Sequence, residues 1–126
     1  MQPNLLSSVP VLHVSSSVAA EEFYCTKLGF AKRWIYRPSA AADPAFMGLE
    51  REGVPLHVSS FSGDGVSGGA AAFFVSDVDS LFAEFSGRGV RIDLEPFDQT
   101  WGNREMYLRD PDNNSLRFIQ PNANPN

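Results

Sequence analysis

Two histidines and several carboxylates are the residues whose side chains could hold a metal ion or move a proton. His13 and His57 each lie in a short apolar run of the kind that forms a strand. With a carboxylate such as Glu50, Glu105 or Asp98, the two imidazoles could bind a divalent cation, and either imidazole could act as a general base. A histidine in a strand is more commonly a half-buried imidazole hydrogen-bonded to the backbone. The spacing of His13 and His57 from other motifs must therefore distinguish a functional role from this structural one.

Trp101 is a second kind of candidate, because it is a large ring in a loop beside Gly102. An exposed indole at such a position lowers solubility unless it contacts a partner. The formal net charge of −5 and the lack of a basic stripe argue against a nucleic-acid partner. A neutral or cationic small molecule fits this charge better.

The 126 residues provide for one domain, which we place at 8–121 between flexible tails at 1–7 and 122–126. The single cysteine, Cys25, cannot form an internal disulfide, which fits a reducing compartment. No apolar run approaches the roughly 20 residues that span a bilayer, and the first residues lack the layout of a signal peptide. We therefore expect a soluble, cytoplasmic protein with no membrane contact.

The elements that must position these residues occur twice along the chain. Shifting the sequence by 60 positions superposes several segments: Ser17-Val18 on Asp77-Val78, Gly29 on Gly89, and Leu56-His57-Val58 on Leu116-Arg117-Phe118. Such an internal repeat indicates two copies of one supersecondary unit. It also places Arg117, a fixed cation, where the first unit has His57.

Each unit, 9–60 and 69–120, is predicted to fold as a strand, a helix and three further strands. Ser17 and Asp77 can cap the two helices, and Gly29 and Gly89 can adopt the left-handed conformation that ends them. Apolar residues at helical spacing follow each cap. The predicted strands are 9–14, 31–37, 46–50 and 54–59 in the first unit, and 71–75, 90–94, 104–109 and 115–120 in the second.

Strand alternation assigns the two faces of each sheet. Leu56 and Val58 should lie under the first helix, as should their repeat partners under the second, which leaves His13, His57 and Arg117 on the opposite face. The predicted fold class is α+β. Two tandem βαβββ modules would form a curved mixed sheet with the helices on its outer face and a ligand trough on the other.

Over about residues 8–121, these motifs and their order resemble the vicinal-oxygen-chelate superfamily of glyoxalases, extradiol dioxygenases and bleomycin-resistance proteins. The motifs that carry the resemblance are Phe23-Tyr24, Leu28-Gly29-Phe30, Val78-Asp79 and Asp110-Pro111-Asp112-Asn113. Two further segments are similar to the bleomycin-resistance branch: Val9-Pro10-Val11-Leu12 and Gln99-Thr100-Trp101-Gly102-Asn103-Arg104-Glu105.

Metal-dependent members of this superfamily bind a divalent ion through four His or Glu side chains, on the first and last strand of each module. Phe23-Tyr24 superposed on the family pattern places the first position at Val9, four residues before His13. The repeat sends Val9 to Gly69 or, with one residue of slippage, to Ala70. The last-strand positions are His57 and Arg117. One ligand of four does not make a site, so we expect neither a metal nor another cofactor.

The resemblance implies a non-catalytic protein that sequesters bleomycin or another planar, cationic natural product. Trp34, Phe46 and Trp101 match the family positions whose rings stack on the drug, although ordinary strand packing would equally explain Trp34. His13, His57 and Arg117 complete the ligand-binding residues that we expect.

The resemblance also implies a homodimer whose clefts hold the drug, with an exchanged first strand in which Pro10 would be the hinge. Two other functions remain open. One is a metal-dependent lyase or dioxygenase of the same superfamily, with relocated ligands or with His13 or His57 as a general base. The other is an accessory protein that binds an unknown natural product, because Ala72 stands where we expect an aromatic residue in a bleomycin binder.

Overall fold

The computed structural model describes residues 3–123, so the outermost parts of the tails that we expect to be flexible, 1–2 and 124–126, lie outside the described residues. The first module comprises β1 (Val11–His13), α1 (Ser17–Glu21), the π-helix η1 (Glu22–Lys27), β2 (Ala31–Tyr36), β3 (Phe46–Arg51) and β4 (Val54–Ser59). The second comprises β5 (Ala70–Phe74), α2 (Val78–Gly87), β6 (Ile92–Asp98), β7 (Arg104–Arg109) and β8 (Ser115–Gln120).

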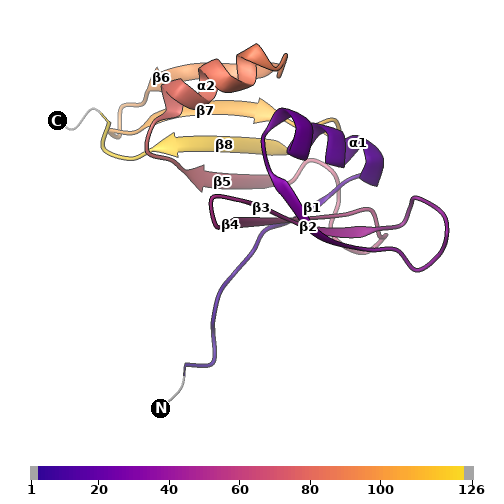
Figure 1. Ribbon diagram of the computed structural model, residues 1–126. Helices are drawn as coiled ribbons and strands as arrows, with labels where there is room; N and C mark the ends of the chain where they lie inside the picture. Colours follow the sequence, from indigo (N-terminus) through magenta and orange to yellow (C-terminus); the bar gives the residue numbers. More distant parts are fainter. Residues whose placement is uncertain (1–2, 124–126) are drawn as a thin grey trace.

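The modules form two four-stranded sheets of the same topology, β1-β4-β3-β2 and β5-β8-β7-β6. In each, the first strand pairs parallel with the last strand and the other neighbours pair antiparallel. A helical segment covers one face of each sheet (Figure 1). The predicted fold class is confirmed, although within residues 3–123 no strand ladder joins the two sheets into one.

Strand pairing fixes which residues of the two modules correspond. Val11 lies opposite His57, and Ala72 lies opposite Arg117. The first strands therefore correspond at a shift of 61, whereas the last strands correspond at 60. This is the one-residue slippage that equates Val9 with Ala70 rather than with Gly69.

The first helix begins differently from the prediction. Its N-cap is Ser16, whose hydroxyl accepts a hydrogen bond from the N–H of Ala19, so the prediction of Ser17 was wrong. Ser17 is buried and instead donates its N–H to Oδ1 of Asp43 over 3.0 Å. The predicted cap of α2 is confirmed, since Asp77 accepts from the N–H of residue 80. No helix in the described part of the chain is long and apolar enough to cross a membrane.

Strand β6 also departs from its predicted range of 90–94. It runs from Ile92 to Asp98 and contains Pro96. Proline lacks a backbone donor, but β6 is an edge strand, and its pairing with β7 is interrupted by two register shifts. A proline would end a central strand, but Pro96 does not end the edge strand β6.

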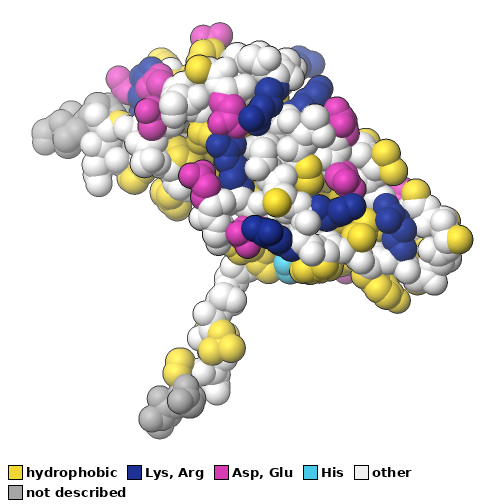
Figure 2. Space-filling model, viewed as in Figure 1, with side chains coloured by type: hydrophobic (Ala, Val, Ile, Leu, Met, Phe, Trp, Pro, Cys, Tyr) yellow, Lys and Arg dark blue, Asp and Glu magenta, His cyan; other side chains and the backbone are white. Residues whose placement is uncertain are grey.

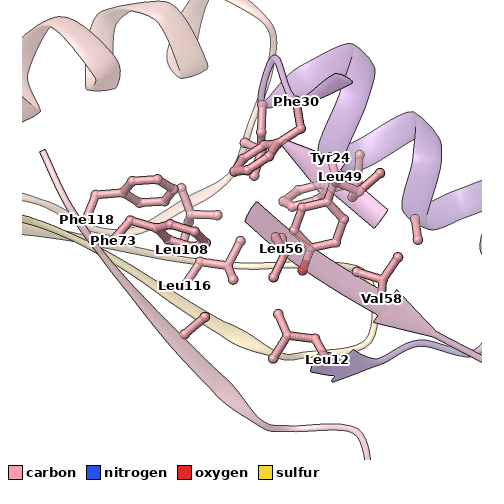
Figure 3. Close-up of a cluster of buried hydrophobic side chains, with 14 of the residues drawn as sticks. Leu12, Tyr24, Phe30, Leu49, Leu56, Val58, Phe73, Leu108, Leu116 and Phe118 are labelled. Carbon is pink, nitrogen blue, oxygen red and sulfur yellow. The ribbon is translucent and has the colours of Figure 1, made fainter. Parts of the chain in front are cut away.

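The helix-facing sides of both sheets share one hydrophobic core (Figure 3). Leu56 and Val58 of β4 are buried there, as are Leu116 and Phe118 of β8, which confirms the predicted faces. Phe73 joins the modules, because its ring stacks on Phe118 and meets Phe30 edge to face at 5.9 Å. Since both sheets turn their helix-facing sides toward this core, their other faces point away from it.

A buried polar network also connects the modules. The hydroxyl of Tyr24 in η1 donates to Oδ2 of Asp110 over 2.7 Å. Asn114 donates its amide to that carboxylate and to the carbonyl of His13, and its Oδ1 accepts from the N–H groups of residues 68 and 69. Burial and the Asp110 carboxylate raise the pKa of Tyr24 far above its usual value, so the phenol remains a donor.

Candidate ligand-binding site

The open face of the first sheet carries a compact aromatic cluster of Trp34, Phe46 and His57. The rings of Trp34 and Phe46 are parallel within 5°, with centroids 5.5 Å apart. The imidazole of His57 meets these rings edge-on at 5.1 and 5.4 Å, respectively. Gly48 lies between Trp34 and His57 in the cross-strand register, and a Cβ atom there would approach the indole to 2.3 Å. Glycine thus leaves the space that the indole occupies.

Burial among these rings lowers the pKa of His57 below its usual value, which favours the neutral imidazole at neutral pH. Trp34 nevertheless remains 45% exposed. Figure 2 shows a histidine side chain at the surface beside hydrophobic ones, near the point where the N-terminal segment leaves the body. The cluster is therefore an accessible, largely uncharged stacking surface.

His13 lies on the same open face of the first sheet, on β1 opposite Ser59. Its Nδ1 atom is buried and has no hydrogen-bond partner among the described residues. Within residues 3–123 no ring contact joins His13 to Trp34, Phe46 or His57. Of the two histidines, only His57 belongs to the aromatic cluster.

The second sheet presents a different arrangement, built around Glu105. Trp101 is 63% exposed and donates its indole Nε1–H to Oε2 of Glu105 over 3.0 Å. The hydroxyl of Tyr107 donates to the other carboxylate oxygen. Arg117, opposite Tyr107 in the register, places its guanidinium 4.9 Å from the centroid of the tyrosine ring. Trp101 and Arg117 of the predicted site are therefore linked through two residues that we did not predict as ligand-binding.

Glu105 is only 4% exposed. Burial alone would raise its pKa, but hydrogen bonds with the side chains of Tyr107, Trp101 and Asn103, together with the charge of Arg117, hold the pKa below its usual value. The same carboxylate raises the pKa of Tyr107 by accepting its hydrogen bond. At neutral pH this cluster therefore combines an ionised carboxylate with a protonated phenol.

The predicted residues fall into two sets on separate sheets. Trp34, Phe46, His57 and His13 belong to strands of the first sheet. Arg117 belongs to β8 of the second sheet, and Trp101 belongs to the loop between β6 and β7. Two grooves of about 360 and 330 Å³ are hollowed into the described part of the protein. The first is lined by residues of both modules, including Phe30 and Phe73, and neither groove is lined by a predicted site residue. Within the described residues, the exposed rings of Trp34 and Trp101 therefore lie outside both of these grooves.

The four metal-ligand positions implied by the superfamily do not fit a divalent ion. They are occupied by Val9, His57, Ala70 and Arg117, of which only His57 carries a ligating atom suited to a cation. Arg117 would repel the ion.

The carboxylates considered as relocated ligands have other partners. Glu50 pairs with Arg33, Asp98 pairs with Arg104, and Glu105 is held by Trp101 and Tyr107. Residues 3–123 contain no group of three or more His, Cys, Asp or Glu side chains placed to hold a metal ion.

The sequence reasoning missed Gly48 and Tyr107, and considered Glu105 only as a relocated metal ligand. Alternation along β7 could have placed Glu105 and Tyr107 on the open face, because Met106 and Leu108 are core residues. Gly48 had no such signal, since its role depends on the register of β2 against β3.

Comparison with known proteins agrees with this architecture. Residues 4–124 match the family described as Glyoxalase superfamily protein. Bleomycin resistance proteins of Geobacillus stearothermophilus and Staphylococcus aureus are 28% identical over 138 residues, covering 92% of this chain and 97% of theirs.

Two solved structures share the fold at 24% identity. The bleomycin resistance determinant encoded on the transposon Tn5 superposes with a TM-score of 0.74, over 93% of this chain and 98% of that one. A bleomycin-binding protein complexed with bleomycin superposes with a TM-score of 0.72, over 92% and 98%. The expected family is thereby confirmed, and the chain belongs to the glyoxalase superfamily.

Proposed function

We propose that this protein binds bleomycin or another planar, cationic natural product and sequesters it without converting it. The observation that carries the proposal is the aromatic cluster of Trp34, Phe46 and His57 on an open sheet face, in which Trp34 is exposed and the other two rings are half-buried. The similarity to bleomycin resistance proteins supports a ligand of this class.

The physical chemistry of the cluster suits such a ligand. The exposed indole of Trp34 and the ring beside it offer π faces on which a flat heteroaromatic group can stack. Burial lowers the pKa of His57 and so favours the neutral imidazole, which does not oppose a cationic ligand. The net charge of −5 attracts such a ligand. His13 extends the same face along β1.

We further propose a homodimer in which the first sheet of one copy faces the second sheet of the other. The reason is that the open faces of one chain point away from its core, while Trp34 on the first sheet and Trp101 in the loop beside the second sheet both remain exposed. An exchanged first strand fits this arrangement, because the segment before β1 extends away from the body and exposes Leu5 and Leu6 (Figure 1). A cytoplasmic location belongs to the same proposal.

An accessory protein for another natural product is the second candidate. Ala72, opposite Arg117 on β5, is small and exposed where a further aromatic ring would strengthen bleomycin binding. A lyase or dioxygenase is not favoured, because the four superfamily positions provide a single ligand.

Isothermal titration with metal-free bleomycin and with Cu(II)-bleomycin tests the proposal. We expect saturable binding that Trp34→Ala and Trp101→Ala each weaken about tenfold or more, since buried aromatic anchors typically contribute over 1–2 kcal/mol to binding. Val66→Ala, at an exposed loop position, is the matched control and should bind as the wild type does. Absence of binding to both forms would refute bleomycin as the ligand and favour the second candidate. Undiminished binding by either tryptophan variant would refute the stacking of that tryptophan on the ligand.

A further inference from the structure

We infer that Glu105 is a positioning residue that fixes the indole of Trp101 in the orientation needed for stacking on the ligand. Only the stacking on a ligand rests on the proposed function, because the anchoring of the ring is a property of the protein alone. It gives a buried carboxylate on the second module a role other than metal binding.

Trp101 needs an anchor because its surroundings provide little packing. The ring is 63% exposed and lies in a short loop after β6. Two backbone hydrogen bonds close this loop, from the N–H of Gln99 to the carbonyl of Asn103 over 2.8 Å and from the N–H of Gly102 to the carbonyl of Gln99 over 3.1 Å. They hold the backbone but leave the side-chain torsions of Trp101 free. The hydrogen bond from Nε1 to Glu105 removes that freedom.

Glu105 is suited to be the fixed partner. It belongs to the central region of the sheet, in β7 between β6 and β8, and is 4% exposed. Its second oxygen accepts from Tyr107, whose ring is in turn covered by the guanidinium of Arg117. The carboxylate is therefore held on both oxygens, and a bond between an ionised acceptor and an N–H donor is roughly twice as strong as a neutral one.

The two tryptophans are thus held by different means. Trp34 is positioned by packing over Gly48 and against two rings, whereas Trp101 is positioned by one polar contact at its edge. A contact at the edge leaves the π face available to a ligand. Glu105 also has a hydrogen bond with the side chain of Asn103 in this loop. The two backbone hydrogen bonds of the loop do not involve Glu105, so removing the carboxylate should increase the motion of the ring while these bonds keep the loop closed.

Fluorescence of Trp101 tests this directly, because the chain has only two tryptophans and Trp34→Phe leaves Trp101 as the single emitter. In that background we compare Glu105→Gln, which weakens the anchor, with Glu105→Ala, which removes it. Glu22→Gln, an exposed carboxylate on η1, is the charge-matched control. Time-resolved anisotropy should gain a fast component, and acrylamide quenching should rise about twofold in Glu105→Gln and further in Glu105→Ala.

Affinity for metal-free bleomycin is then measured with Trp34 intact. Immobilising one free side chain costs roughly a three- to tenfold factor in affinity, so Glu105→Ala should bind that much more weakly and Glu22→Gln should not. Unchanged anisotropy and quenching in a folded Glu105→Ala variant would overturn the inference. If that variant does not fold, the same result in Glu105→Gln overturns it. A ring that is fixed in the wild type and mobile in Glu105→Ala, in a protein that does not bind bleomycin, would refute the ligand and leave the anchor supported.

Discussion

Gly48→Ala should displace Trp34 from the open face of the first sheet. The added methyl group would lie 2.3 Å from Cε2 and Nε1 of the indole and 2.7 Å from Cζ2, well inside van der Waals contact. Gly48 is part of a central strand that pairs on both sides, so its backbone cannot move away. The half-exposed indole must therefore swing outward.

The cost follows from the contacts that the indole makes. Its ring pairs with Phe46 and His57 are worth about 0.5–1.5 kcal/mol each, or about 1–3 kcal/mol together. Alanine recovers about 0.5–1 kcal/mol relative to glycine in a strand. We expect a net loss of about 0.5–2 kcal/mol in the free energy of unfolding, with the pKa of His57 rising as its burial is lost.

The pH dependence has a defined sign. Because burial lowers the pKa of folded His57, its contribution to stability is present above the unfolded pKa of about 6.5 and is lost as the pH falls through the folded pKa. Gly48→Ala should flatten that part of the stability profile. Urea unfolding gives the free energy, and NMR titration of the His57 ring gives the pKa.

Gly87→Ala is the matched control, because a Cβ atom at this last residue of α2 meets nothing within 4 Å. Its stability should equal or slightly exceed that of the wild type. If Gly48→Ala leaves both the His57 pKa and the free energy of unfolding unchanged, the indole does not lie over Gly48 and the geometry of the cluster is refuted.

Two further predictions concern the contacts between the modules. Tyr24→Phe leaves the buried carboxylate of Asp110 without its phenol donor and should lower the free energy of urea unfolding by about 1–3 kcal/mol. The control Tyr36→Phe, at an exposed tyrosine, should change it by less than about 0.5 kcal/mol. Equal effects of the two substitutions would contradict a structural role for the buried network. Glu84→Gln removes the ion pairs with Arg51 and Arg88 and should cost about 0.5–1 kcal/mol at pH 7. The hydrogen bond from Arg51 lowers the pKa of Glu84, so the difference in free energy of unfolding between the wild type and Glu84→Gln should disappear as the pH falls below about 4.3. A difference that persists at pH 2 would refute an electrostatic origin of the stabilisation.

The fold was predictable because its signals are local and occur twice. The repeat at 60 positions, the helix-ending glycines and the alternation in β4 and β8 each need only neighbouring residues. The N-cap was not predictable in the same way, because Ser15, Ser16 and Ser17 can all cap a helix. A hydrogen bond to Asp43, 26 residues away, assigns Ser17 to another role.

The site was predictable as residues but not as an arrangement. Alternation correctly placed His57 and Arg117 on open faces. The contact of Trp34 with His57 depends on Gly48, which lies between them on the intervening strand β3. The contact of Trp101 with Glu105 depends on how the loop after β6 folds back on β7. The first contact depends on non-local strand register, which a single sequence does not encode at short range. The second joins residues four apart and depends on the conformation of the loop.

The proposed sequestration needs no metal, and titration of metal-stripped protein shows whether this is so. The protein is treated with a chelator, its content of Ni, Zn, Fe and Mn is measured, and metal-free bleomycin is then titrated calorimetrically. We predict that the molar ratio of metal to protein is far below one and that one bleomycin molecule still binds saturably to each chain. Binding that appears only after one equivalent of a divalent metal is restored to the protein would refute metal-independent sequestration.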